Sequence, residues 1–220
     1  MTERIQIVEN ILSANDRLAR ENIELLNSFK VFSINIMASP GAGKTTFILK
    51  TLEAMQGRLR MGVIEGDLAS TIDTDKAIAA GLPAVQINTG GECHLDANMV
   101  KDALASMPLK EMDLLIIENV GNLVCPVNFK IGSHLNILIA SIPEGDDKPY
   151  KYPGSYRGMD ALIISKIDLL PYVPFNMNYF TKGVEILNPG LATFPVSAKT
   201  GEGMAAWSNW LVQKVNQWKS

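Results

Sequence analysis

The chain has 220 residues, of which 47% are hydrophobic and 20% are charged, and its formal net charge is -3. These values suit one α/β domain with a buried core, and the mild acidity leaves no basic field that would attract nucleic acid or an anionic membrane. The only two cysteines, Cys93 and Cys125, argue against a disulfide-stapled scaffold. The first residues show no apolar signal region, and no apolar run approaches the roughly 18 residues that span a bilayer. We therefore expect a cytoplasmic protein whose two thiols stay free for metal chemistry.

The spacing of apolar residues predicts an N-terminal helical extension, residues 1–29, followed by alternating strands and helices. Residues 3–28 have helical spacing, with a division into two pieces near residues 13–16. The extension either packs on the domain or docks a partner, and the spacing does not decide between the two. Strands are expected at residues 31–37, 61–65, 84–87, 114–118, 135–141, 161–165 and 194–196, and helices from residue 44, at 98–107 and at 203–218. Apolar strands separated by helices predict a three-layer α/β fold, with helices on both faces of a mostly parallel sheet.

Residues 143–157 form the one long irregular stretch that the sequence predicts. They contain several proline and glycine residues and lack a helical or strand period. Loops of this length inside a compact domain commonly serve function. We therefore expect this stretch to serve a function.

The first predicted strand runs into a glycine-rich loop of the kind that binds phosphate. Residues 38–45 read Ala-Ser-Pro-Gly-Ala-Gly-Lys-Thr, which matches the P-loop pattern G-x-x-x-x-G-K-[ST] except that Ala38 replaces the first glycine. Backbone N–H groups of such a loop hold phosphates, Lys44 adds positive charge at the β- and γ-phosphates, and Thr45 offers a hydroxyl to Mg²⁺. We predict a P-loop domain over residues 30–220. Its phosphate contacts come from Ser39, Pro40, Gly41, Ala42, Gly43, Lys44, Thr45 and Thr46.

Carboxylates that suit Mg²⁺ and the attacking water follow two other strands. Glu118 ends the apolar strand 114–118, while Asp67, Asp73 and Asp75 follow the strand after the P-loop helix. Phosphoryl transfer needs positioning and charge stabilisation, which such carboxylates supply. The predicted catalytic and magnesium residues are Lys44, Thr45, Asp67, Asp73 and Glu118. Which acid contacts Mg²⁺ stays open, and a solvated acidic loop is the alternative for any single aspartate.

Two later motifs predict that the nucleotide is GTP. Residues 165–168 read Ser-Lys-Ile-Asp, close to the guanine-reading N-K-x-D, with Ser165 in place of the asparagine that braces the loop. Asp168 can accept from the guanine N1–H and 2-amino group, which adenine does not offer, and the Lys166 stem covers the base. Residues Ser197, Ala198 and Lys199 resemble the loop that offers a backbone N–H to guanine O6. ATP as the natural nucleotide remains the alternative.

Both cysteines and one of the two histidines gather near the predicted phosphate site. Cys93 and His94 are adjacent after one strand, and Cys125 follows Glu118 on the loop after another. Loops after parallel strands meet at one sheet edge, and thiolate and imidazole suit Ni²⁺ or Zn²⁺. Three ligands leave an open, exchangeable site, whereas a structural zinc takes four. The alternative is that each cysteine is an inert small hydrophobe, and His134, which begins an apolar strand, is interpreted as structural.

Five segments resemble those of the hydrogenase nickel-incorporation GTPase family, HypB. They read NTG-x-x-CHLDA at 88–97, IENVGNLVCP at 117–126, PEGDDKP-x-KYP at 143–153, KIDLLPY at 166–172 and SAKTGEGM at 197–204. The resemblance implies a SIMIBI-class P-loop protein that forms a homodimer on GTP loading, with Cys93, His94 and Cys125 as its metal site. It also implies dimer-interface positions at Lys151, Leu169 and Val173. Implied partners are a nickel metallochaperone, docked by the N-terminal helices, and the large subunit of nickel–iron hydrogenase.

Several functions remain open on the sequence alone. The resemblance implies that GTP hydrolysis gates nickel insertion, and a urease-type nickel maturation GTPase is the near alternative, although its Cys-Pro-His motif is absent. An adaptor or metal buffer with a degenerate nucleotide site is a second alternative, supported by Ala38 and Ser165. An ATP-driven partitioning or cofactor-loading protein is the third. The N-terminus carries no cysteine cluster or histidine tract, so nickel is expected at the domain site.

Overall fold

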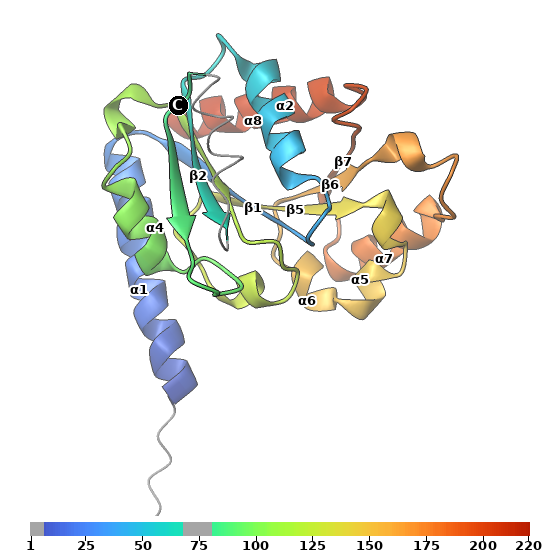
Figure 1. Ribbon diagram of the computed structural model, residues 1–220, viewed down its shortest axis with the longest axis horizontal. Coiled ribbons are helices and arrows are strands. Elements are labelled where there is room, and N and C mark those ends of the chain that lie inside the picture. The colour runs from blue at the N-terminus through green and yellow to red at the C-terminus, as the bar shows by residue number, and fades with distance from the viewer. Residues whose placement is uncertain (1–6, 68–80) are drawn as a thin grey trace, which may run out of the picture.

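The computed structural model describes residues 7–67 and 81–220 and contains one seven-stranded sheet (Figure 1). The strands are β1 (Phe32–Ala38), β2 (Met61–Asp67), β3 (Ala84–Asn88), β4 (Leu114–Glu118), β5 (Leu135–Ser141), β6 (Ala161–Ser165) and β7 (Ala192–Pro195). Their order is β3-β2-β4-β1-β5-β6-β7, and every neighbouring pair is parallel. The predicted α/β fold is confirmed, and the described sheet is wholly parallel.

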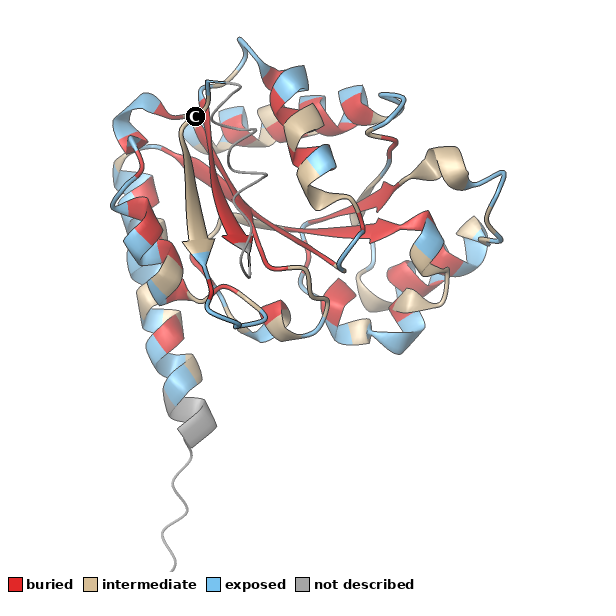
Figure 2. Ribbon diagram, in the orientation of Figure 1, coloured by how far each residue is buried: buried red, intermediate tan, exposed pale blue. Residues whose placement is uncertain are grey.

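Helices cover both faces of this sheet, and its central strands are largely buried (Figure 2). The helices are α1 (Ile7–Ser28), α2 (Lys44–Met55), α4 (Ala97–Leu104), α5 (Lys148–Lys151), α6 (Pro153–Tyr156), α7 (Met177–Leu187) and α8 (Met204–Lys219). On one face, α2 and α8 pack on alternate residues of the central strands around the fully buried Trp207. On the other face, α1 and α4 cover one half of the sheet and α6 and α7 cover the other. Within the described ranges, no helix is long and apolar enough to cross a membrane.

The helix α1 is continuous from Ile7 to Ser28, so the expected division near residues 13–16 was wrong. Asn15, which suggested a break, is buried, and its side chain bonds to Ala97 N and Lys130 O of other segments. A polar residue at this position therefore belongs to the packed face of the helix. Leu26 of the same helix lies in the core with Leu115 of β4, so α1 packs on the P-loop domain.

Other differences from the expected elements lie on the α5–α7 side of the sheet. The stretch 143–157, expected to be irregular, forms a 3-10 turn followed by α5 and α6. The helix α7 was not predicted, because its interior Gly183 weakens the local signal. A β-carbon at Gly183 would lie 2.8 Å from the Tyr150 ring, so a side chain there would displace that ring from α7. The last strand ends at Pro195, one residue before the expected end.

The contacts of His134, directly before β5, support its interpretation as a structural residue. His134 Nδ1 accepts from Ser33 N–H at 2.9 Å, so Nε2 carries the proton and faces Asn27 Oδ1 at 2.9 Å. Its ring stacks on Phe32 with centroids 4.8 Å apart. Burial lowers the pKa of His134 to about 4. A second ring proton would also face the Ser33 N–H donor, so the site favours the neutral imidazole.

This lowered pKa predicts a loss of stability in mild acid. The unfolded chain takes up a proton at His134 near the ordinary pKa of about 6.5, whereas the folded chain does so only near about 4. The free energy of unfolding should therefore fall as the pH drops between these values, by about 1–2 kcal/mol from pH 7 to pH 5. Urea unfolding at both pH values measures the loss, and His134→Asn should flatten it. An equally steep loss in His134→Asn would contradict the assignment.

Candidate nucleotide and metal site

The predicted P-loop connects the carboxyl end of β1 to the start of α2. Gly41 and Gly43 have φ angles of 75° and 93°, a left-handed conformation that favours glycine. Ala38 is the buried last residue of β1 and is not among the residues with positive φ. The first position of the motif therefore needs no glycine in this chain, and the replacement leaves the loop conformation intact.

The loop hydroxyl and the predicted magnesium acid are in contact. Thr45 Oγ1 donates to Glu118 Oε1 at 3.1 Å, and Glu118 is buried at the end of β4. Glu65 on β2 is the register partner of Glu118 and is buried as well, a second carboxylate that the sequence motifs did not indicate. Hydroxyl and carboxylate oxygens are the ligand types that Mg²⁺ prefers. The donor set at the end of β4 therefore fits a magnesium ion.

The other predicted acids remain predictions. Asp67 is the last residue of β2, but its side chain lies outside the described part of the structure. Asp73 and Asp75 lie outside the described residues altogether.

The loop after β4 lies directly against the P-loop. A β-carbon added to Gly121 would be 3.2 Å from Pro40 Cα and 3.3 Å from Lys44 Nζ. Separations this short leave little room for any side chain at residue 121. The backbone of this loop therefore approaches the amino group that is predicted to contact the β- and γ-phosphates.

A cavity of about 300 Å³ beside the P-loop unites both base-reading motifs. It is lined by Ala42, Gly43, Thr46, Phe47, Ser165, Lys166, Asp168, Leu169, Val196, Ala198 and Lys199. Ser197 lies behind this lining and donates through Oγ to Asp168 Oδ1 at 2.7 Å. Since segments around residues 42, 166 and 198 are distant in the sequence, their convergence supports the interpretation as a base pocket.

Two residues of the base motif hold the P-loop in place. Ser165 Oγ donates to Ala42 O at 2.8 Å, and Lys166 Nζ donates to Gly41 O at 2.7 Å. The serine thus braces the loop, which is the role expected of the usual asparagine. Lys166 adopts a φ of 61°, rare for a residue with a side chain and common where function constrains the backbone.

The three predicted metal ligands lie on neighbouring loops. Cys93 Sγ is 3.6 Å from His94 Nδ1. The neighbouring Cys125 raises the pKa of the exposed Cys93 thiol. Cys93 therefore lies near both of the other groups. As they stand, however, no three His, Cys, Asp or Glu side chains in residues 7–67 and 81–220 are close enough to hold one metal ion together. The donor chemistry fits Ni²⁺ or Zn²⁺, while the geometry needs adjustment to close around either.

Several residues that the motifs did not indicate as functional position these ligands. Phe129 packs on the His94 ring with centroids 4.0 Å apart. Asn122 Nδ2 donates to Cys93 O at 3.3 Å, and its Oδ1 accepts from Cys125 N at 3.4 Å. The fully buried Asn119 accepts from Leu95 N at 3.0 Å and from Val120 N at 2.9 Å. The only sequence signal was the presence of both asparagines between Glu118 and Cys125.

The predicted dimer-interface residues lie on the α5–α7 side of the protein. Lys151, at the end of α5, is exposed and pairs with Asp147 at 2.5 Å. Leu169 and Val173 are half-buried against the core beneath α7, and Leu169 also lines the base pocket. The neighbouring Tyr172 is 81% exposed.

Comparison with known proteins identifies the family. The model of the CobW/HypB/UreG nucleotide-binding domain matches residues 32–195. "Hydrogenase maturation factor HypB" of Azotobacter vinelandii is 43% identical over 207 residues, covering 94% of this chain and 68% of that protein. The chain belongs to the HypB family. The "Hydrogenase/urease maturation factor HypB" of Helicobacter hepaticus is 42% identical over 214 residues, which are 96% of this chain and 88% of that protein.

A solved HypB structure shares the fold of this chain. The crystal structure of HypB from Helicobacter pylori in complex with nickel superposes with a TM-score of 0.87 at 38% identity. The match covers 93% of this chain and 96% of that one. The predicted P-loop fold is thereby confirmed. The P-loop lies within residues 32–195, which match the nucleotide-binding domain of this family.

The contact between Ser165 and the P-loop predicts a matched pair of variants. Ser165→Ala removes the hydrogen bond to Ala42 O, worth about 1 kcal/mol, and should weaken GDP binding roughly five-fold. Ser165→Asn restores an amide donor and should bind GDP about as well as the unmodified protein. Fluorescent-nucleotide titration measures both. Unchanged affinity in Ser165→Ala would show that the serine does not brace the loop.

Proposed function

We propose that this HypB-family protein is a GTP-hydrolysing metallochaperone that gates nickel insertion into nickel–iron hydrogenase. The observation that carries the proposal lies on β4 and the loop that follows it. Glu118 at the end of β4 contacts Thr45 of the P-loop, and Asn122 on the loop donates through Nδ2 to Cys93 O, beside Cys125. One segment therefore contacts both the phosphate site and the metal ligands. A change at one end of this segment displaces the other.

Each nucleotide residue has a defined part in the proposed hydrolysis. The P-loop amides and Lys44 would bind the phosphates and offset negative charge that develops on them. Thr45 and Glu118 would hold Mg²⁺, which would supply further charge stabilisation. Asp168 would select guanine through its carboxylate, steadied by the Ser197 hydroxyl.

Nickel is the proposed cargo, and its ligands are Cys93, His94 and Cys125. The Helicobacter pylori HypB structure is a complex with nickel, which supports this choice of metal, and thiolate with imidazole also suits zinc. Asn119 offers a physical link to nucleotide state, because it directly follows Glu118 and accepts from Leu95 N beside His94. Movement of the magnesium acid would therefore reach the segment that carries Cys93 and His94.

Assembly and location are part of the same proposal. A homodimer formed on GTP loading would involve Lys151, Leu169 and Val173, and the exposed Tyr172 adds apolar area to that surface. A nickel metallochaperone and the hydrogenase large subunit are the proposed partners, in the cytoplasm. The names of the relatives refer to hydrogenase maturation, which supports this choice.

The alternatives have lost some of their support. A degenerate nucleotide site rested on Ala38 and Ser165, yet Ala38 needs no left-handed backbone and Ser165 braces the P-loop. GTP turnover that disappears in Lys44→Ala would exclude a simple adaptor or buffer. The Helicobacter hepaticus relative bears both "hydrogenase" and "urease" in its name, so urease stays the near alternative as the recipient of nickel.

The base pocket predicts how nucleotide selection fails. Asp168→Asn removes one of two hydrogen bonds to guanine and should cost GTP about 1–3 kcal/mol of binding, with weaker discrimination against other bases. Glu202→Gln is the control, because Glu202 accepts from Ser197 N through its backbone oxygen, which the substitution retains. Competition of GTP, ATP and XTP against a fluorescent GDP measures selectivity. Unaltered preference for GTP in Asp168→Asn would refute the base assignment.

A further inference from the structure

The two segments that carry the proposed metal ligands meet a third segment, the N-terminal helix. Cys93 and His94 lie between β3 and α4, while Cys125 lies between β4 and β5. No covalent bond fixes the distance between these segments. Contacts along α1 therefore contribute to that distance.

Two buried asparagines of α1 each contact both segments. Asn15 Oδ1 accepts from Ala97 N at 2.9 Å, and Asn15 Nδ2 donates to Lys130 O at 2.8 Å. Asn22 Nδ2 donates to Ala97 O at 2.8 Å and to Ile131 O at 3.0 Å. Both side chains are buried, 7% and 1% exposed. Each amide thus joins the start of α4, just after His94, to the segment that follows Cys125.

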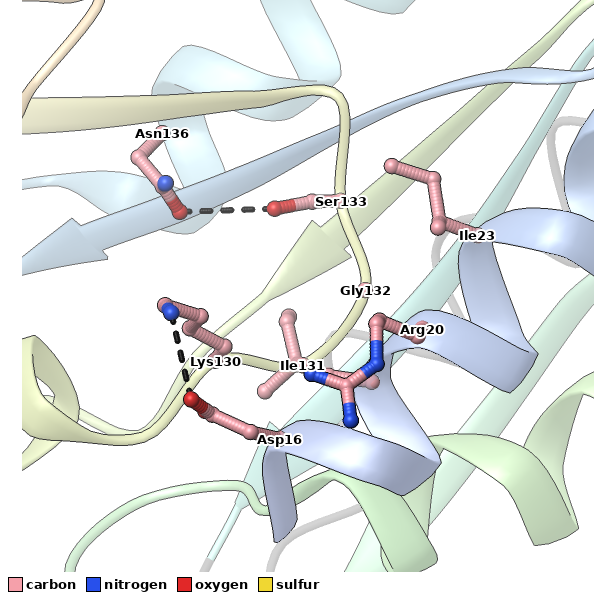
Figure 3. Close-up of a pocket in the computed structure, with 9 residues that line it drawn as sticks. Asp16, Arg20, Ile23, Lys130, Ile131, Gly132, Ser133 and Asn136 are labelled. Carbon is pink, nitrogen blue, oxygen red and sulfur yellow. Dashed lines mark hydrogen bonds and ion pairs between the residues drawn. The ribbon is translucent and has the colours of Figure 1, made fainter. Parts of the chain in front are cut away.

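The helix α1 and the segment that follows Cys125 are in close contact around these hydrogen bonds. A β-carbon on Gly132 would lie 2.5 Å from Ala19 O, so only glycine allows the segment to approach α1 this closely. At the surface, Lys130 Nζ pairs with Asp16 at 3.2 Å beside a cavity that α1 shares with residues 130–133 and Asn136 (Figure 3). An exposed pair of this kind contributes little, whereas the buried amides leave unsatisfied backbone groups if removed.

We infer that Asn15 and Asn22 are positioning residues of the metal site, so that α1 is a structural part of that site. They act through Ala97 on the Cys93–His94 side and through Lys130 and Ile131 on the Cys125 side. The inference rests on the proposed function, because it assumes that these three side chains bind the metal. Outer contacts that orient metal ligands typically alter affinity 10- to 100-fold when removed.

The same helix offers a matched control. Asn27, also on α1, bonds through its side-chain oxygen to His134 Nε2, directly before β5. Asn27→Ala therefore removes a side-chain hydrogen bond from α1 while it leaves both bridges intact. A general loosening of α1 would weaken metal binding in Asn15→Ala, Asn22→Ala and Asn27→Ala alike. A positioning role predicts weaker metal binding in the first two only.

The experiment measures Ni²⁺ affinity of the full chain by competition with a chromophoric chelator, together with the thiolate-to-nickel absorption and the melting temperature. Asn15→Ala and Asn22→Ala should weaken Ni²⁺ binding on the order of ten-fold and shift the absorption, while Asn27→Ala lowers the melting temperature without either change. Asn15→Asp keeps the acceptor for Ala97 N but loses the donor to Lys130 O. Its Ni²⁺ affinity should therefore resemble that of Asn15→Ala. This variant provides the test if Asn22→Ala does not fold.

Wild-type affinity and absorption in folded Asn15→Ala and Asn15→Asp would overturn the inference, as would an equal loss in Asn27→Ala. A different result would contradict the proposed function instead. If the unmodified protein binds Ni²⁺ no better than Cys93→Ser, the assigned metal site itself is wrong.

Discussion

Because all described strands run parallel, every loop that carries a proposed functional side chain leaves the same edge of the sheet. The strand β4 sits beside β1 and β2 at its centre, and its buried end places Glu118 against Thr45. Ligand-binding crevices of open α/β sheets form at such edges, outside the carboxyl ends of the strands. The phosphate loop, the base pocket and the thiols are neighbours for this reason, although they span more than half of the chain.

The central strands also limit how the site can respond to a ligand. Residues 114–118 are buried throughout, so close packing opposes local bending of β4. The loop beyond it passes close to Pro40 and Lys44 at Gly121 and bonds to Cys93 O through Asn122. A nucleotide-dependent metal site requires that GDP and GTP contact the P-loop side of this segment differently.

Much of this arrangement could be predicted from local patterns. The P-loop, the guanine motif and the apolar strands each have a fixed spacing, and the structure brings the first two together around one cavity. The continuity of α1 and the existence of α7 could not be predicted in this way. Asn15 resembles a helix-breaking residue until its distant partners Ala97 and Lys130 are known, and Gly183 weakens a helix that packing on Tyr150 restores. The amide contacts of Asn15, Asn22 and Asn119 depend on the tertiary fold and leave no periodic signal.

The most direct measurement is a Ni²⁺ titration of the purified protein without nucleotide, with GDP and with a non-hydrolysable GTP analogue, each beside Cys93→Ser. Coupling through β4 predicts that nickel affinity differs between the GDP and GTP-analogue states by several-fold, corresponding to roughly 1 kcal/mol or more, and that the difference disappears in Cys93→Ser. Equal affinity in all three states, or binding that is indifferent to Cys93, would contradict a nucleotide-gated metal site.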